Sequence, residues 1–193
     1  MRYPTEHKQQ TRERIVKAAA RRFRSRGSEG AAIGDLMRDL RLTHGGFYRH
    51  FDSKEDLFAQ VFEHSLEQVR HKFAPAVARA PQGQELKALI EAYLDTAHCA
   101  NPAEGCPLAA LASEVARRPR STRVAFQRAL ESHITLIARF VPGENETERE
   151  RKAMTLISGM AGTLAVARMM TDDESRRRLL DSAKQFYFHA AQQ

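Results

Sequence analysis

The sequence predicts an all-α protein, with an N-terminal three-helix unit followed by a larger helical domain. Two observations predict this class. Apolar residues recur three and four positions apart through most of the chain, as in amphipathic helices, and no segment gives a convincing strand pattern. A tight connection at residues 41–45 also joins two short helical segments, which is the pattern of a helix-turn-helix.

The first three helices have recognisable ends. The first is expected to stop at Gly27, after a last turn whose basic residues suit the helix dipole. The second is shorter, amphipathic, and ends near Arg41. Thr43 can cap a third, very short helix that runs through His50. These segments make up the predicted helix-turn-helix.

A longer fourth helix follows and connects two predicted domains, 1–52 and 53–193. Ser53, with Asp56 three positions later, can cap this helix, and Pro75 is expected to end it. A connection rich in Pro, Gly and Gln comes next. The remaining helices are predicted near residues 86–94, 108–115, 124–140, 146–170 and 173–190.

Charge is distributed unevenly along the chain. Residues 1–54 hold 13 Lys and Arg against 6 Asp and Glu, whereas residues 55–193 hold 18 of each kind. The whole net charge of +7 therefore lies in the first quarter. A basic unit beside a neutral body suits contact with a polyanion, because neutralising phosphates releases counterions; a merely solvated basic surface is the alternative.

Membrane, secreted and metal-dependent classes are not expected. The longest uncharged stretch near the C-terminus, 153–167, is shorter than the roughly 20 residues needed to span a bilayer. The first residues lack the apolar core of a secretion signal, so we expect a cytoplasmic protein with Cys99 and Cys106 as free thiols. Neither a metal site nor a cofactor is expected. A thiol enzyme is disfavoured too, because His98 and Cys99 are adjacent and would point in different directions on a helix.

The segment AAIGDLMRDLRLTHGGFYRHFDSKEDLF, residues 31–58, resembles the DNA-binding region of the TetR family of transcriptional regulators. The resemblance covers about residues 10–60, and one departure is Gly46, where Ala or Thr is common. It implies a regulator, usually a repressor, that binds a near-palindromic DNA operator as a homodimer and is released by a small-molecule effector. A DNA-binding protein without an effector is the main alternative.

Candidate DNA contacts cluster around the short third helix. Gly45 and Gly46 would remove bulk where the backbone approaches DNA, and the rings of Phe47 and Phe51 are expected to pack inward. A cation in the first turn of a helix, such as Lys54, suits a nearby phosphate unless it is simply solvated. The candidates are Thr43, His44, Gly45, Gly46, Tyr48, His50 and Lys54.

The resemblance implies that the second domain dimerises and binds the effector. The segment around 154–170 is apolar on nearly its whole circumference, so one face could meet a second copy of the chain. The interface candidates are Ser158, Gly159, Gly162, Ala165, Phe186 and Tyr187. The pocket candidates are Tyr93, Cys106, Phe126, His133, Ile137 and Met160.

Cys106 has a second interpretation. It precedes Pro107 at the start of a predicted helix, where a thiol pKa can be lowered. Cys106 could therefore sense oxidants or electrophiles, or it could be an inert buried thiol.

Overall fold

The N-terminal unit of the computed structural model is a helix-turn-helix, as the sequence predicts. The structure describes residues 5–192, and this range contains helices but no strand. Helix α1 (Thr5–Arg26) ends where Gly27 takes a positive φ of 75°, a conformation that favours glycine. It is followed by α2 (Ile33–Asp39) and the short η1 (His44–Arg49). The third element is a 3-10 helix, so its turns are tighter than those of an α-helix.

Helix α3 (Lys54–Arg79) begins at the predicted cap, because Ser53 Oγ accepts a hydrogen bond from the backbone N–H of Asp56 at 3.1 Å. Its predicted end was wrong. Pro75 lies inside the helix, which continues for another turn to Arg79. Proline costs a helix one hydrogen bond, here to the carbonyl of His71. Pro75 and His71 are both exposed, so water can satisfy that carbonyl while the buried side of the helix continues.

The rest of the chain forms a helical body. Helices α4 (Glu85–Tyr93), α6 (Pro107–Ala116), α7 (Arg120–Ala138), α8 (Glu146–Ala167) and α9 (Asp173–Gln192) lie close to the predicted ranges. The short α5 (Thr96–Ala100) and η2 (Pro102–Glu104) were not predicted. Within residues 5–192, no helix is both long enough and apolar enough to cross a bilayer.

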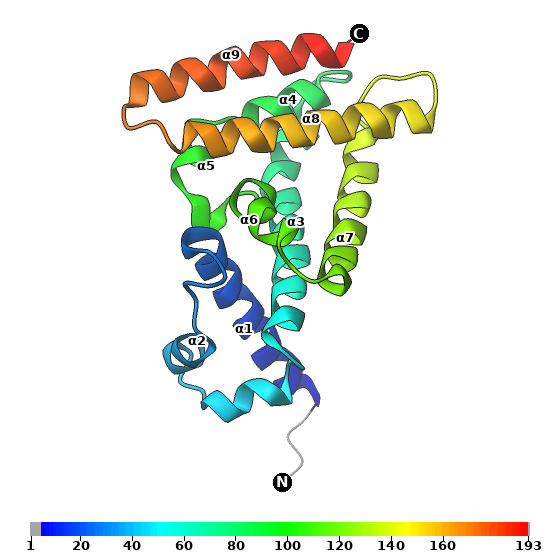
Figure 1. The fold of residues 1–193 in the computed structure, drawn as a ribbon. Helices are drawn as coiled ribbons and strands as arrows, with labels where there is room; N and C mark the ends of the chain where they lie inside the picture. The colour runs from blue at the N-terminus through cyan, green and yellow to red at the C-terminus, as the bar shows by residue number, and fades with distance from the viewer. Residues whose placement is uncertain (1–4, 193) are drawn as a thin grey trace.

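Helix α3 runs through the length of the molecule and joins its two hydrophobic cores (Figure 1). Its first half, from Leu57 to Leu66, packs with α1, α2 and η1. Its second half, including Val69 and Phe73, packs with α4, α7 and α8. Helices α8 and α9 pack side by side across the end of the molecule opposite η1.

The first core extends beyond the N-terminal unit. Leu111 of α6 and Phe126 of α7 are buried in it. The centroid of the Phe126 ring lies 4.3 Å from the centroid of the Phe62 ring and 5.0 Å from that of the Phe58 ring. The division of the chain at residues 52 and 53 therefore stays a prediction, because side chains from both predicted domains share this core.

Candidate nucleic-acid interface and ligand pocket

Two buried rings fix η1 against the first core. Phe47 and Phe51 are stacked with their centroids 5.3 Å apart, and both belong to the cluster that contains Ile15, Ala19 and Phe58, as expected. Because these rings point inward, Tyr48 points outward and is 61% exposed. The expectation that Phe47 and Phe51 serve packing is confirmed, and the polar tip of Tyr48 is left free to meet a partner.

The start of η1 is shaped by the two adjacent glycines. Thr43 Oγ1 accepts a hydrogen bond from the backbone N–H of Gly46 at 3.2 Å, so the predicted cap is present. A Cβ at Gly46 would lie 3.2 Å from that same oxygen, whereas a Cβ at Gly45 would meet nothing within 4 Å. The space beside Gly45 is therefore open, and a binding partner could come close to the backbone there.

The end of η1 is held by Arg12 of α1. Its Nε donates to the carbonyl of His50 at 3.3 Å, and its guanidinium lies 5.3 Å from the centroid of the Phe51 ring. Burial, and then the charges of Lys8, Arg12 and Arg49, lower the pKa of His50. The His50 ring is therefore neutral at neutral pH and has one proton to donate.

A basic groove between the start of α1 and η1 gathers several candidates. Thr43, Gly46 and His50 line it, as do four basic residues that the sequence argument did not single out: His7, Lys8, Arg41 and Arg49. Their only sequence signal was the excess of positive charge in residues 1–54. His44 and Tyr48 are exposed on η1, with their rings 6.1 Å apart.

Lys54 lies half-buried in the first turn of α3 and forms no ion pair within the described residues. The pKa of Glu29 is lowered by a hydrogen bond from Arg118 and by the charge of Lys54. Lys54 thus opposes the helix dipole and has no ion-pair partner in the described part of the chain, so a phosphate could pair with it.

A polar network ties the N-terminal unit to the helical body. Glu114 of α6 accepts a hydrogen bond from the backbone N–H of Ser28 at 3.0 Å. Arg118, just after α6, pairs with Glu29 and with Glu55 of α3, each at 2.9 Å, and lies over the Phe58 ring. The loop after α1, the start of α3 and the end of α6 are therefore held together by one guanidinium.

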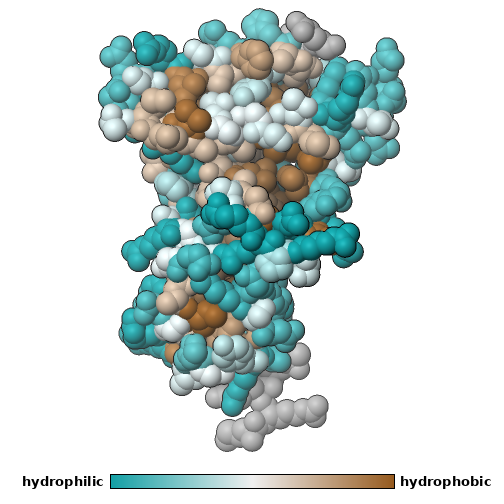
Figure 2. Space-filling view, in the orientation of Figure 1, coloured by the Kyte–Doolittle hydropathy of each residue, from teal (hydrophilic) through white to brown (hydrophobic). Residues whose placement is uncertain are grey.

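A pocket of about 380 Å³ lies between α3 and α7 where the two helices diverge, with α4 and α8 behind it. Figure 2 shows apolar side chains recessed in this region below α8. Five of the six predicted residues line the pocket: Tyr93, Cys106, His133, Ile137 and Met160. Phe126 does not, because it is packed in the first core, about two turns before His133 on α7.

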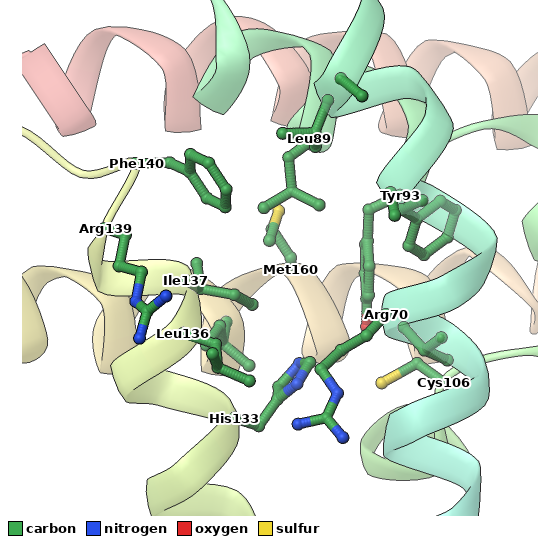
Figure 3. Close-up of a pocket in the computed structure, with 16 residues that line it drawn as sticks. Arg70, Leu89, Tyr93, Cys106, His133, Leu136, Ile137, Arg139, Phe140 and Met160 are labelled. Carbon is green, nitrogen blue, oxygen red and sulfur yellow. The ribbon is translucent and has the colours of Figure 1, made fainter.

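The pocket has an apolar end and a polar end. In Figure 3, Leu89 and Phe140 lie at one end, while the His133 ring and the Arg70 guanidinium lie together at the other, towards which the Tyr93 ring points. Burial, and then the charge of Arg70, lower the pKa of His133 to about 4. The His133 ring is therefore neutral at neutral pH.

Cys106 lines the pocket, but its thiol is not activated. It is fully buried, and this burial raises its pKa despite hydrogen bonds from Tyr93 and from the backbone of Ala109 and Leu108. The expectation of a lowered pKa at this helix start was wrong, because desolvation outweighs the helix amides. Cys99 is also a buried free thiol with a raised pKa.

The outer face of α8 and α9 is apolar and exposed. Met154, Val166 and Met169 on α8 or just after it, and Phe186 on α9, are the large apolar residues concerned; Met169 is 77% and Phe186 66% exposed. Ser158 and Gly162 lie on the same stripe of α8, and nothing lies within 4 Å of a Cβ built on Gly162. Ala165 is half-buried beside them.

Gly159 and Tyr187 have a different role from the other interface candidates. A Cβ on Gly159 would lie 2.7 Å from Tyr187 Oη of the same chain, and Tyr187 is hydrogen-bonded to Thr163 at 3.0 Å. The absence of a side chain at Gly159 therefore allows α9 to pack closely on α8 within one molecule. Of the two glycines of α8, Gly162 is the one whose backbone is accessible from outside the molecule.

Taken together, the fold and the exposed recognition element define a DNA-binding transcriptional regulator of the helix-turn-helix class. Comparison with protein families supports this class at both ends of the chain. Residues 15–61 match the family model "Bacterial regulatory proteins, tetR family", and residues 83–183 match "Tetracyclin repressor-like, C-terminal domain". The chain belongs to the TetR family, whose members are transcriptional regulators and not enzymes.

Relatives and solved structures agree with this assignment. The HTH-type transcriptional regulator LmrA of Bacillus subtilis is 24% identical over 153 residues, 78% of this chain and 81% of its own. The HTH-type transcriptional repressor KstR2 of Rhodococcus jostii is 28% identical over 111 residues, 58% of this chain and 53% of its own. A TetR regulator from Chloroflexus aurantiacus has 28% identity and a TM-score of 0.72, covering 97% of this chain and 96% of that one.

One structural neighbour was solved with a ligand. The regulator FadR of Bacillus subtilis, in complex with stearoyl-CoA, superposes with a TM-score of 0.69 over 91% of this chain and 96% of that one. Its identity to this chain is 13%, so the similarity concerns the fold alone.

Proposed function

We propose that this regulator is a cytoplasmic repressor that binds a near-palindromic operator as a homodimer and leaves it when a small molecule enters the pocket. The observation that carries the proposal is the pairing, in one chain, of an outward-facing η1 with an apolar pocket at the other end of α3. Helix α3 contributes to both sites. A ligand in the pocket and DNA at η1 can therefore each shift the position of the same helix.

DNA contact is assigned to η1 and its surroundings. Tyr48 and His50 can reach phosphates, His44 lies where it can read a base edge, and Lys54 supplies a phosphate contact at the start of α3. Thr43 orients η1, while Gly45 and Gly46 allow its backbone to come close to the duplex. The basic groove beside η1 adds non-specific affinity through counterion release.

Dimerisation is assigned to the outer face of α8 and α9. Its support is the exposed apolar surface around Phe186, Val166 and Met169, together with the open backbone at Gly162. Large apolar side chains exposed on neighbouring helices are compatible with a protein interface. Ser158 and Ala165 would lie at the contact, and a two-fold axis there would place two copies of η1 on successive major-groove faces.

The effector site is assigned to the pocket between α3 and α7, lined by Tyr93, Cys106, His133, Ile137 and Met160. Repression is supported by the similarity to KstR2, a transcriptional repressor that matches this chain over 53% of its own length. The raised pKa of Cys106 gives no support to a thiol sensor, so the reversible pocket model is preferred.

The test starts from the DNA beside the gene, searched for inverted repeats. A fluorescent duplex carrying the repeat is titrated with the full chain at several salt concentrations, and the stoichiometry is measured by sedimentation. We expect two chains for each repeat and an affinity that falls steeply with salt. Salt-independent binding, or equal binding to scrambled duplexes, would contradict the proposal. Binding that no pocket ligand alters would support a DNA-binding protein without an effector.

A further inference from the structure

The polar end of the pocket holds buried polar groups that lack strong hydrogen-bond partners. His133 is 4% exposed and its Nδ1 has no hydrogen-bond partner within the described residues. Tyr93 is 5% exposed, and the acceptor beside its hydroxyl is the thiol of Cys106, a weak acceptor. Buried polar atoms are nearly always paired in native proteins, so the unpaired His133 nitrogen, together with a hydroxyl that has only a weak sulfur acceptor, indicates that a ligand group belongs there.

Arg70 adds a positive charge to the same end. Its side chain is half-buried, lines the pocket, and forms no ion pair with any acidic residue in the described part of the chain. Figure 3 shows its guanidinium beside the His133 ring. A guanidinium presents several fixed donors and no acceptor, and it matches the geometry of a carboxylate.

The remaining lining decides the charge and the body of the ligand. No Asp or Glu lines the pocket within residues 5–192, and the second charged lining residue, Arg139, is also a cation, exposed at the rim. A cationic ligand is therefore disfavoured. The other walls are apolar, with Phe73, Leu89 and Met160 among them, so the body of the ligand must be apolar as well.

The volume limits the size. About 380 Å³ lies near the lower end of the range for small-molecule pockets, about 300 to 1,000 Å³. It suits a compact molecule with one head group. The exposed residues Ala74, Ala78 and Phe140 surround the mouth, so an extended apolar tail can reach the pocket from the gap between α3 and α7.

We propose that the pocket binds a small organic acid with an apolar body, and that Arg70, His133 and Tyr93 bind its single carboxylate. This inference rests on the proposed function, because it names the chemical class of the effector for the same pocket. The carboxylate accepts hydrogen bonds from the Arg70 guanidinium, from one N–H of His133 and from the Tyr93 hydroxyl, while the apolar body lies against Leu89 and Met160.

The test compares ligands that share one body and differ in the head group. Decanoate, decanol and decylamine are titrated into the full chain below their aggregation limits. Isothermal calorimetry is the readout, since the chain contains no tryptophan to report binding. We expect one decanoate for each chain, with an affinity at least tenfold above that of decanol, and the weakest binding for decylamine. Equal affinity for decanoate and decanol, or no binding of any of the three, would overturn the inference.

Two variants assign the head group to its site. Arg70→Met keeps an unbranched apolar stem, removes the charge, and should abolish the preference for decanoate while leaving the affinity for decanol unchanged. Arg139→Met, the matched control at the rim, should keep the preference. If both variants lose the preference to the same extent, the general positive charge of the region is responsible and the assigned site is wrong. Thermal melting of both variants verifies that they are folded.

Operator binding measured in parallel separates this inference from the proposed function. If decanoate binds through Arg70 but leaves the DNA complex intact, the carboxylate site stands and the effector model fails. If decanol releases DNA as well as decanoate does, the effector model stands and the carboxylate site fails.

Discussion

The imidazole of His98 accepts a hydrogen bond through Nε2 from the backbone N–H of Cys106, with the two nitrogens 3.1 Å apart. Its Nδ1 lies 2.6 Å from the carbonyl oxygen of Tyr93. Because Nε2 is the acceptor, the proton must be on Nδ1, which donates to Tyr93. One neutral ring thus joins Tyr93, at the end of α4, to Cys106, the residue just before α6, and both of these residues line the pocket.

The first prediction concerns removal of that link. His98→Leu should lower the free energy of unfolding by about 2 to 4 kcal/mol at pH 7.5, because it leaves a buried N–H and a buried carbonyl unpaired. Urea unfolding measures the loss. His71→Leu, at an exposed histidine on α3, is the matched control and should change stability little. A loss no larger than that of the control would mean that water replaces the ring.

The second prediction concerns pH. The pKa values of His98 and His133 are both lowered to about 4, mainly by burial. Lys72 and Arg168 lower that of His98 further, whereas the Tyr93 carbonyl and Asp95 raise it; Arg70 lowers that of His133. Between about pH 6.5 and 4 the unfolded chain binds more protons, so stability should fall as the pH is lowered through this window.

Each of the two histidines should contribute a loss of about 2 kcal/mol between pH 7.5 and pH 5. His133→Leu removes one contribution without breaking a hydrogen bond, and should reduce the loss of stability between the two pH values by about 2 kcal/mol. Unfolding curves at the two pH values measure this. An unchanged dependence in the variant would place the acid sensitivity elsewhere.

The third prediction separates positioning from sequence recognition at the DNA. Lys54→Ala should weaken binding to all duplexes about equally and reduce the slope of log affinity against log salt by about one. Lys87→Ala, at an exposed lysine on α4, should leave the slope unchanged. His44→Ala should instead alter the preference among duplexes. Uniform weakening by His44→Ala would assign that ring to the phosphates.

The fourth prediction uses the open side of Gly45. Gly45→Ala should leave the free protein as stable as the wild type or up to about 1 kcal/mol more stable, since nothing obstructs the added methyl group. If the duplex approaches this backbone, operator affinity should fall at the same time. Thermal melting and a DNA titration on the same preparation check both statements; undiminished affinity would show that the duplex does not come close at Gly45.

The fifth prediction tests assembly. Phe186→Asp should place a charge in the proposed interface and shift the chain towards monomers, as should Gly162→Leu by holding the helices apart. Gly159→Leu is unsuitable because it would strike Tyr187 in the same chain. Val124→Asp, at an exposed apolar residue on α7, is the control. Sedimentation measures the mass, and a wild-type dimer in both variants would move the interface to another face.

Much of the architecture could be predicted from local patterns. The caps at Thr43 and Ser53 depend on side chains within three residues of the helix start, and the structure has both hydrogen bonds. The inward packing of Phe47 and Phe51 follows from helical spacing. Five of the six pocket candidates line one cavity because apolar residues that face a core also face any space within it.

The errors depend on contacts between distant segments. Helix α3 passes Pro75 because the buried turns on either side pack against the second core. Phe126 enters the first core because α7 meets α3 at Phe62, a contact that spacing along α7 does not reveal. The pKa of Cys106 depends on how much chain covers it, and the role of Gly159 on the position of Tyr187. None of these is encoded in nearby residues.

The contact between the rings of Phe62 and Phe126 is a point about which α3 can tilt relative to α7. Helices α3 and α7 are in contact there, and the distance between them increases towards the pocket (Figure 1). Along α3, the distance from Phe62 to Ala78 in the pocket wall is about 24 Å, and from Phe62 to Lys54 about 12 Å, at 1.5 Å per residue. A rigid tilt of α3 about this point would move its DNA end half as far as its pocket end, and in the opposite direction. A tilt that moves the pocket end of α3 by about 2 Å would displace Lys54 by about 1 Å. In the proposed dimer, the two-fold axis would make the second copy of Lys54 move by the same amount.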